Sequence, residues 1–567
     1  MTEYELLRII TFLERVKGPY RELVPIAEED ASWNMLLYLI KQNLTGSPVT
    51  MSSLASIANI PFATANRRIH ELIESGHILK KTASETGRSF VLLPSPELSQ
   101  SFAQYAKRIK ALLAETFGLR PKFEDEDSYY FGGSYFATQI IPPPQLVESL
   151  FRGKRELKFL LNDDNYFASM TDMWSDFRNN MASRKNFDRL KLPDLHARII
   201  ENAAKPTSAY DIVAFNAPWA GEVANKGVFR SLNSLIEGSS ISPHDFHPSV
   251  WSMGTWQGRQ IGVPIYCTIE LLAARTDLFG RDKIAYPTTF DETVAAAKHF
   301  HKPAKQLYGI AWNGGRGMPI ASTFMFLMAC CGESILKIPK SRLFFTVDRA
   351  VGEQLRPQIL SEAGFHVLDY LHRLVEFSSP DILSMDWDKR TTAFLTGQAA
   401  LAYCWTVRAA RFETDINSAV KHKVAYLQQP KGPKGASNNP MGGFLLGIPS
   451  NLPEPRVQLA FEAISWMTSP EAMKANVRNG FPVAPRFSVS ADPEAAATSP
   501  IVSVVDQLAK LNLLKSWPRP PVPEYLSIEK IIGDAIHEAL RGEISDREAL
   551  TKAQSAVDRL MHGAGYY

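Results

Sequence analysis

The chain has 567 residues, of which 45% are hydrophobic and 21% are charged, and its formal net charge is +3. A chain of this length exceeds a single hydrophobic core, so we expect about three to four lobes, and the composition is that of a globular protein rather than a disordered chain. The small net charge by itself indicates neither a nucleic-acid partner nor a membrane partner.

The first residues and the cysteines predict the compartment. Residues 1–5 carry acids where a secretory signal needs basic residues, and charged residues bound the apolar run 9–13. The longest apolar stretch, residues 320–331, is shorter than the roughly 20 residues that span a bilayer. The four cysteines form no CxxC pair and lie in apolar surroundings, which favours buried, reduced thiols. We therefore expect a cytoplasmic protein with no membrane partner.

Helical and β patterns alternate in the first part of the chain. Apolar residues recur at helical spacing, and two short β runs flank a turn at Gly87. The expected helices cover residues 4–16, 33–42, 51–58, 62–75 and 98–117, and the expected strands cover residues 77–82 and 89–93. This order predicts a helix-turn-helix with a β wing.

The helix over residues 62–75 has one apolar and one polar face, as a DNA-recognition helix does. Thr64 lies on the polar face, and Arg67 or Arg68 can reach guanine edges. The hairpin supplies cations for phosphates or the minor groove: Lys80, Lys81 and Arg88. The alternative is a small helical adaptor whose arginines are only solvated.

Residues 48–93 resemble the winged helix of the MarR-type regulators. The matching stretches are Thr50-Met-Ser-Ser-Leu-Ala-Ser-Ile-Ala58, the helix from Ala63 to Ser75, and Glu74-Ser-Gly-His-Ile78. The resemblance implies a homodimer that binds a near-palindromic operator in double-stranded DNA. The helices over residues 4–16 and 98–117 would form the dimer.

Acidic residues at 124–127 and three prolines at 142–144 predict an interdomain linker. Beyond it, strand candidates at residues 157–161, 210–215 and 260–263 alternate with amphipathic helices, a pattern typical of βα units and parallel sheets. We therefore expect a multidomain chain: a mainly α winged region over residues 1–118, a linker over residues 119–154, and an α/β ligand-binding domain over residues 155–567.

The region from about residue 155 to residue 561 resembles the ABC-transporter extracellular solute-binding proteins of the maltose-binding, carbohydrate class. One matching segment is Tyr210-Asp-Ile-Val-Ala-Phe-Asn-Ala-Pro-Trp219, and another is Trp256-Gln-Gly-Arg-Gln-Ile-Gly-Val-Pro264. Further matches follow in order at residues 285–291, 387–402, 442–449 and 463–471. The resemblance implies two α/β lobes around a hinge, the type 2 periplasmic-binding-protein fold, which closes on one small carbohydrate.

Sugars have apolar ring faces and hydroxyl rims, so their recognition needs aromatic platforms beside charged or amide groups. Loops after the predicted strands supply both kinds of side chain: Asp164, Asn165, Asn216 and Trp219. By family position, the resemblance adds Glu270 as a ligand-contacting acid and Trp405 as a stacking tryptophan, with Arg408 nearby.

A glycine-rich segment forms a second candidate loop, because glycine lets a ligand approach the backbone closely. This loop contributes Trp312, Asn313 and Arg316, and position alone adds Gly442, Gly443, Phe444 and Tyr525. Structural alternatives stay open for these sites: the tryptophans can belong to the core, Glu270 can be an ion-pair partner, and Arg316 and Arg408 can bridge the lobes.

Catalytic and metal motifs do not stand out in the sequence. His537-Glu538 is not followed by a second histidine at helical spacing, and the chain has no GxSxG motif. A glycosidase with two carboxylates far apart in the chain stays open as an alternative. We predict no enzymatic activity, no metal and no cofactor.

Together these patterns predict a cytoplasmic, ligand-responsive transcriptional regulator. In this hypothesis a sugar or oligosaccharide closes the two lobes and alters the affinity for operator DNA. The first alternative is the solute-binding protein of a carbohydrate ABC transporter with an N-terminal protein-interaction module. The second alternative is an exported transport component.

Overall fold

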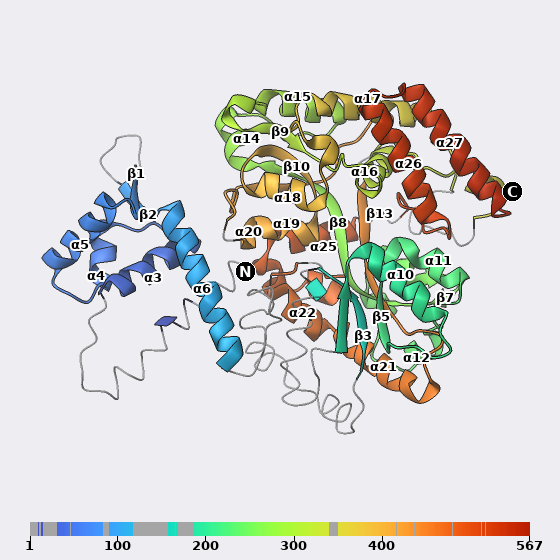
Figure 1. The fold of residues 1–567 in the computed structure, drawn as a ribbon, viewed down its shortest axis with the longest axis horizontal. Coiled ribbons are helices and arrows are strands. Elements are labelled where there is room, and N and C mark those ends of the chain that lie inside the picture. The colour runs from blue at the N-terminus through green and yellow to red at the C-terminus, as the bar shows by residue number, and fades with distance from the viewer. Residues whose placement is uncertain are drawn as a thin grey trace. The chain divides into compact units, whose positions relative to one another are not determined.

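The computed structural model describes most of the chain beyond residue 30. The described residues are 10, 13–14, 31–45, 47–82, 90–116, 157–164, 166–167, 170, 186–338, 350–415, 417–435, 438–478, 480–482, 484–511, 513–515 and 517–567. They fall into two compact units, one within residues 1–135 together with 414–416, and one that takes up the rest (Figure 1). The predicted linker, residues 119–154, lies outside the described residues.

The N-terminal unit consists of helices around a β-hairpin. Its elements are α3 (Ala31–Leu44), α4 (Met51–Ile57), α5 (Phe62–Glu74), β1 (Ile78–Thr82), β2 (Phe90–Pro94) and α6 (Pro96–Thr116). Thr50 starts α4, because its hydroxyl accepts the backbone N–H of Ser53. Gly76 follows α5 with a φ of +77°, a left-handed conformation that favours glycine and ends the helix.

A small core holds this unit together. Met35 of α3, Leu54 of α4, Ile69 of α5 and Leu92 of β2 are almost fully buried and pack into one cluster. The hairpin is antiparallel, with Lys80 opposite Leu92. The described helices and the hairpin therefore lie within two residues of their predicted ranges, whereas most of the helix predicted over residues 4–16 lies outside the described residues.

The larger unit is built on one mixed sheet with the strand order β4-β3-β5-β12-β8-β10-β9. The strands of this sheet are β3 (Phe159–Asn162), β4 (Phe187–Leu190), β5 (Ile212–Asn216), β8 (Val263–Arg275), β9 (Tyr308–Ala311), β10 (Ala399–Trp405) and β12 (Asn439–Gly447), with β11 (Val424–Leu427) paired to β8 and β13 (Leu514–Lys515) paired to β12. A separate small sheet pairs β6 (Thr255–Trp256) with β7 (Arg259–Gln260). Strands β3, β4 and β5 pair in parallel, as do β9 and β10. These parallel pairs confirm the predicted α/β class for this region.

Two lobes arise because β8 belongs to both halves of the sheet. Its first half pairs with β12, and its second half pairs with β10 from Glu270 on and with β11 from Leu272 on. Every residue of β8 except Arg275 is buried, as expected for a strand covered on both faces. The two-lobed periplasmic-binding-protein fold predicted for the C-terminal region is therefore present (Figure 1).

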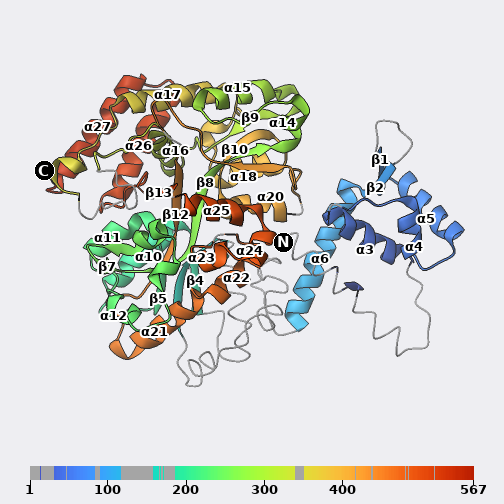
Figure 2. The same ribbon diagram turned by 180° about the vertical axis from the view of Figure 1, so that it is seen from behind.

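Helices cover the lobes. The first lobe carries η2 (Ala217–Trp219), α10 (Leu192–Ala203), α11 (Ala220–Asn225), α12 (Asn233–Ile236), α13 (Pro248–Trp251), α21 (Glu454–Met467), α22 (Pro470–Arg478), α23 (Phe487–Ser490), α24 (Pro493–Thr498) and α25 (Pro500–Lys510). The second carries α14 (Thr276–Asp282), α15 (Phe290–Phe300), α16 (Met318–Cys330), α17 (Glu362–Val375), α18 (Trp387–Leu395), α19 (Thr406–Ala409), α20 (Arg411–Thr414), α26 (Tyr525–Leu540) and α27 (Asp546–Gly563). Seen from behind, α22, α23 and α24 lie on the lobe of β4 and β5 (Figure 2).

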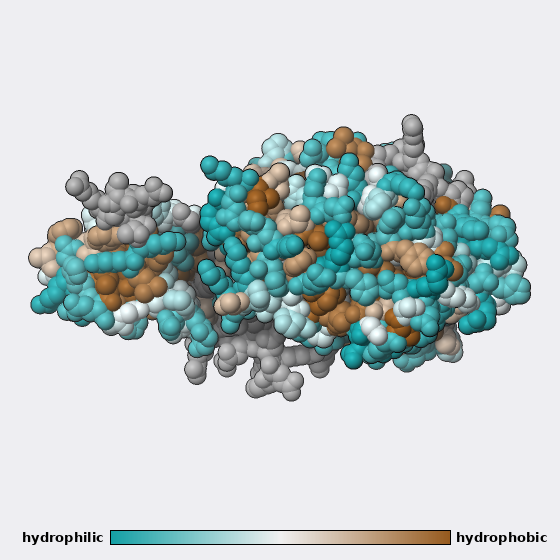
Figure 3. Space-filling view, turned by 90° about the horizontal axis from the view of Figure 1, so that it is seen from above, coloured by the Kyte–Doolittle hydropathy of each residue, from teal (hydrophilic) through white to brown (hydrophobic). Residues whose placement is uncertain are grey.

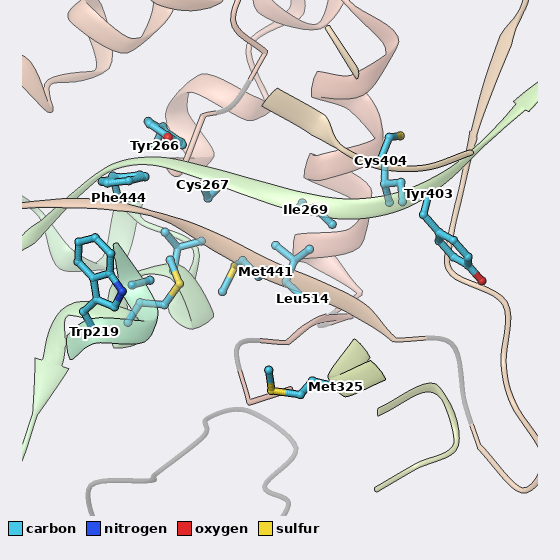
Figure 4. Packing of buried hydrophobic residues seen from close by; sticks show 14 of the residues in the cluster. Trp219, Tyr266, Cys267, Ile269, Met325, Tyr403, Cys404, Met441, Phe444 and Leu514 are labelled. Atoms are coloured by element: carbon cyan, nitrogen blue, oxygen red, sulfur yellow. The ribbon is translucent and has the colours of Figure 1, made fainter. Parts of the chain in front are cut away.

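The core of the larger unit continues across the strand crossing. Figure 4 shows Tyr266 and Ile269 of β8 beside Met441 and Phe444 of β12, with Trp219 of η2 close by. All five are buried. The crossing strands are therefore packed on apolar side chains.

The visible surface is mostly hydrophilic, with scattered apolar patches, in the view of Figure 3. Such patches are normal on globular proteins. Among the described residues, no helix combines the length and the apolar character that crossing a membrane would require.

Candidate functional site

The carboxylate predicted on the crossing strand forms a buried ion pair. Glu270 of β8 accepts from Arg390 of α18 over 2.5 Å at Oε1 and 3.0 Å at Oε2, and both side chains are almost fully buried. Burial raises the pKa of Glu270, while the charges of Arg390, Arg519 and Arg408 oppose that rise. Glu270 therefore sits where three arginines converge.

Trp405 ends β10 directly opposite Glu270, since the two residues are register partners. Its indole is only 6% exposed. Phe326 of α16 contacts it edge-on with ring centres 5.4 Å apart, and Arg519 Cζ lies 5.2 Å from the indole centre. The predicted stacking tryptophan is thus covered by another side chain of the protein.

Gly442 of β12 lies against the same arginine. A Cβ atom at this position would be 2.3 Å from Arg519 Nη2 and 3.5 Å from the edge of Trp405. The absence of a side chain at Gly442 therefore makes room for the guanidinium group.

Tyr525 begins α26, and its hydroxyl donates to Glu529 Oε1 over 2.6 Å. Both side chains are buried. Burial raises the pKa of Glu529 to about 7, although Tyr525, Arg519 and Ser322 pull it down. An acid that titrates near neutral pH therefore lies behind Arg519.

The loop after β3 brings an acid from the first lobe. Asp164 accepts from Tyr266 Oη over 2.7 Å and from the backbone N–H of Phe167 over 2.8 Å. Burial raises the pKa of Asp164, and the charge of Arg408 is among the effects that lower it. Arg408 of α19, on the second lobe, also pairs with Asp388. Asp164 and Arg408 therefore interact electrostatically across the lobes.

The remaining first-lobe candidates lie close to the crossing strands. Asn216 ends β5 opposite Phe444 of β12, and Trp219 is buried with its ring 5.0 Å from His196. Gly443 has a φ of +154°, and a Cβ there would lie 2.2 Å from the carbonyl oxygen of Tyr266. Only glycine fits this close approach of two strands. Asn165 lies outside the described residues.

The residues of the glycine-rich loop contact the second lobe rather than the strand crossing. Trp312 is fully buried, and its Nε1 donates to Ser378 Oγ over 2.9 Å. Asn313 is also buried, and its backbone carbonyl accepts from Thr323. Arg316 is exposed and pairs with Asp534 of α26 over 2.8 Å. These contacts tie the loop to the second lobe, so the ion pair of Arg316 with Asp534 does not bridge the two lobes.

Several residues at the junction were missed from the sequence. They are Tyr266, Phe326, Arg390, Arg519 and Glu529. The described residues contain no group of three His, Cys, Asp or Glu side chains that could hold a metal ion. One signal was available: Arg519 lies in Trp517-Pro-Arg-Pro-Pro-Val-Pro523, whose prolines predict a stiff segment.

The candidates in the N-terminal unit are mostly exposed. Thr64, Arg67 and Arg68 lie on the open face of α5, and Lys80 and Lys81 lie on β1. Arg88 is outside the described residues. Both arginines of α5 pair with one acid on the same face, since Glu71 lies 3.7 Å from Arg67 Nε and 3.4 Å from Arg68 Nη1.

Comparisons with known proteins identify the fold of the larger unit. The family model described as bacterial extracellular solute-binding protein matches residues 194–474. A mannitol-binding protein of Pseudomonas aeruginosa is 23% identical over 390 residues, which cover 66% of this chain and 85% of that protein.

Solved structures agree with this match. An ABC-transporter solute-binding protein of Agrobacterium radiobacter K84 in complex with ribitol has 25% identity and a TM-score of 0.64, and covers 71% of this chain and 98% of that chain. One of Agrobacterium vitis S4 with bound D-mannitol has 21% identity and a TM-score of 0.61, with 72% and 99% covered. A maltose-bound protein of T. maritima has 18% identity, a TM-score of 0.61, and 71% and 99% covered. The C-terminal unit has the extracellular solute-binding-protein fold, with carbohydrate-binding neighbours.

The predicted transcriptional regulator and its operator DNA partner are wrong. The matched family and relatives are solute-binding proteins, a class that works with transporter permeases. The expectation rested on the order of the predicted helices and basic hairpin and on the resemblance to MarR-type regulators. In the structure Glu71 offsets Arg67 and Arg68 on the same helix face. Exposed arginines of this kind are usually solvated surface groups.

The predicted cytoplasmic location is also wrong, because the matched family model describes extracellular binding proteins. The prediction relied on the character of residues 1–5, the charge-bounded apolar run 9–13, the short apolar stretch 320–331 and the cysteines, and none of these outweighs the family match. The same match is consistent with a binding protein rather than an enzyme.

Proposed function

We propose that the chain is the solute-binding protein of an ABC transporter for a sugar or sugar alcohol. The observation that supports this most is the convergence of polar groups at the strand crossing, where Glu270, Arg519 and Asp164 meet buried aromatic side chains. Charged groups beside aromatic rings suit ligands with both hydroxyl groups and C–H surfaces. The ribitol-bound, mannitol-bound and maltose-bound relatives supply the ligand class.

Ligand binding to the folded protein tests this proposal. Ribitol, D-mannitol and maltose are added to the purified full chain, and both melting temperature and heat of binding are recorded. A ligand at 100 times its Kd stabilises the native state by about 2.7 kcal/mol, which raises the melting temperature. A panel in which no sugar or sugar alcohol binds would overturn the proposal.

A matched pair of variants links binding to the junction. Asp164→Ala should weaken binding, because it removes the acid that the first lobe presents to Arg408. Arg281→Ala is the control, since Arg281 is an exposed residue of α14 that pairs with its neighbour Asp282. Equal loss in both variants would speak against a site at the junction.

The N-terminal unit, we infer, is a winged helix-turn-helix arrangement that serves protein contact. The supporting features are the antiparallel hairpin after α5 and large apolar side chains that stand open to solvent. Phe62 is 58% exposed, Leu79 43% and Ile57 41%. A contiguous exposed apolar patch marks a surface that contacts another protein, and these side chains from α5, β1 and α4 are the candidates for such a patch.

Binding of the full chain to its reconstituted permease tests this role. Phe62→Ser should weaken that binding and leave ligand affinity unchanged, because Phe62 belongs to the other compact unit. Thr45→Ala, also at an exposed position of the N-terminal unit, is the control. Unchanged permease binding in Phe62→Ser would remove the proposed role.

A further inference from the structure

The ring face of Trp405 is occupied by an arginine. Arg519 Cζ lies 5.2 Å from the indole centre and 5.6 Å from the ring centre of Phe326. Guanidinium groups stack favourably on aromatic faces. Phe326 meets the indole edge-on at 82°, and Trp405 as a whole is only 6% exposed.

Several features hold Arg519 in this position. The segment from Pro518 to Pro523 contains four prolines, whose φ angles are fixed by their rings. The segment is wedged against the first lobe, since a Cβ at Gly221 of α11 would lie 1.9 Å from the carbonyl oxygen of Pro521. Tyr525 and Glu529 lie behind the guanidinium, and Gly442 leaves it room in front. Arg519 is therefore a preorganised group.

The position of Arg519 affects which ligands fit. A ring sugar is recognised by stacking its flat C–H face on an aromatic ring. An open-chain sugar alcohol has no ring face, and its hydroxyl groups need hydrogen-bond donors and acceptors. A guanidinium carries five N–H donors. In the described part of the chain, Arg519 Nε is buried without a hydrogen-bond partner.

We propose that Arg519 makes this site selective for open-chain sugar alcohols over ring sugars, because it covers the tryptophan face on which a ring would stack and offers N–H donors instead. This inference rests on the proposed function. Gly442 also contributes to the proposed selectivity, since any larger residue there would push the guanidinium of Arg519 away from the indole of Trp405.

Calorimetric titration of the full chain with ribitol, D-mannitol, D-glucose and maltose tests the proposal. The wild-type protein should bind at least one of the two sugar alcohols about tenfold or more tightly than either ring sugar. Arg519→Ala should lower that affinity by about tenfold or more and reduce the preference, because the indole face opens. Gly442→Ala should reduce the preference as well.

Controls separate selectivity from folding. Arg281→Ala should keep both affinity and preference, and circular dichroism should show that each variant is folded. If Arg519→Ala fails to fold, the preference for sugar alcohols is measured in Arg519→Lys and Gly442→Ala instead. Both variants should show a reduced preference, since lysine keeps the charge without a planar group.

The titrations distinguish a failure of the selectivity proposal from a failure of the proposed function. If the wild-type protein prefers glucose or maltose, the proposed function stands and the selectivity is overturned. If the folded variants keep the wild-type preference, Arg519 is not its source and the inference is overturned. If none of the four ligands binds to the wild-type protein, both the inference and the proposed function fail.

Discussion

Arginines are used in opposite ways in the two compact units. On α5 of the N-terminal unit, Arg67 is 76% exposed and lies 3.7 Å from Glu71. In the larger unit, Arg390 is 1% exposed and holds Glu270 with two hydrogen bonds. Water screens the first pair and is excluded from the second. The difference teaches that the burial of an arginine, more than its presence, indicates how strongly the structure depends on it.

Removing the buried Arg390 should have the largest effect on the free energy of unfolding. Arg390→Ala is expected to lower the free energy of unfolding by about 3–5 kcal/mol, because it leaves Glu270 buried without its partner. Urea unfolding monitored by tryptophan fluorescence measures this. Replacing both Arg390 and Glu270 by methionine is the control and should recover most of the loss. If Arg390→Ala lowers the free energy of unfolding by less than about 1 kcal/mol, the proposed difference between buried and exposed arginines is wrong.

The next largest effect on the free energy of unfolding should come from Glu529, and it should depend on pH. The folded protein keeps the Glu529 proton up to a pKa of about 7, whereas the unfolded chain releases it near the ordinary value of 4.5. Since the native state binds more protons between these values, stability falls as pH rises from about 4.5 to about 7 and then levels off. The total loss is about 3 kcal/mol at most.

Glu529→Gln isolates this contribution, because glutamine cannot ionise. The stability of the variant minus that of the wild-type protein should increase between pH 4.5 and pH 7. Urea unfolding at several pH values measures the difference. A difference that stays constant over this range would show that Glu529 does not titrate there.

A half-buried ion pair should give an intermediate effect. Arg456 of α21 is 30% exposed and donates to Asp211, which is 3% exposed, over 2.5 and 2.8 Å. Arg456→Ala should cost about 1–3 kcal/mol. The cost stays below that of Arg390→Ala because Asp211 keeps the backbone N–H of Lys158 as a partner at 2.8 Å. Urea unfolding tests the order, and an Arg456→Ala cost equal to that of Arg390→Ala would overturn the burial argument.

Removing the exposed Arg67 should have the smallest effect on stability. Arg67→Ala should leave the unfolding midpoint unchanged, because its pair with Glu71 is screened by water. Differential scanning calorimetry of the full chain measures this. A clear fall in the melting temperature would mean that α5 depends on this side chain, and the contrast between the two units would be lost.

Local patterns in the sequence predicted much of the fold. The helix expected over residues 62–75 is α5 (Phe62–Glu74), and the strand expected over residues 210–215 is β5 (Ile212–Asn216). Proline and glycine signals placed the start and the end of α5 correctly. Periodicity and turn chemistry act over a few residues, so they can be read from one sequence.

The candidate site was only partly predictable, because it depends on contacts between distant residues. Glu270 was proposed as a ligand contact, but its partner Arg390 comes 120 residues later. Trp405 was proposed as a platform, but Arg519, which covers it, lies in a segment without periodicity. No local pattern reports which side chain will cover an aromatic ring. The predicted regulator function was wrong for a related reason: helices followed by a basic hairpin are not specific to DNA-binding proteins, and the sequence does not show what such a unit contacts.

The four cysteines give the molecule an internal indicator of unfolding. Cys267, Cys330, Cys331 and Cys404 are free and buried, and burial raises the pKa of Cys267 and of Cys331 to about 12. An alkylating reagent attacks the thiolate, so the native state should be protected both by exclusion and by protonation. All four belong to the larger unit. Alkylation kinetics would therefore report the opening of the solute-binding fold alone, without any engineered label.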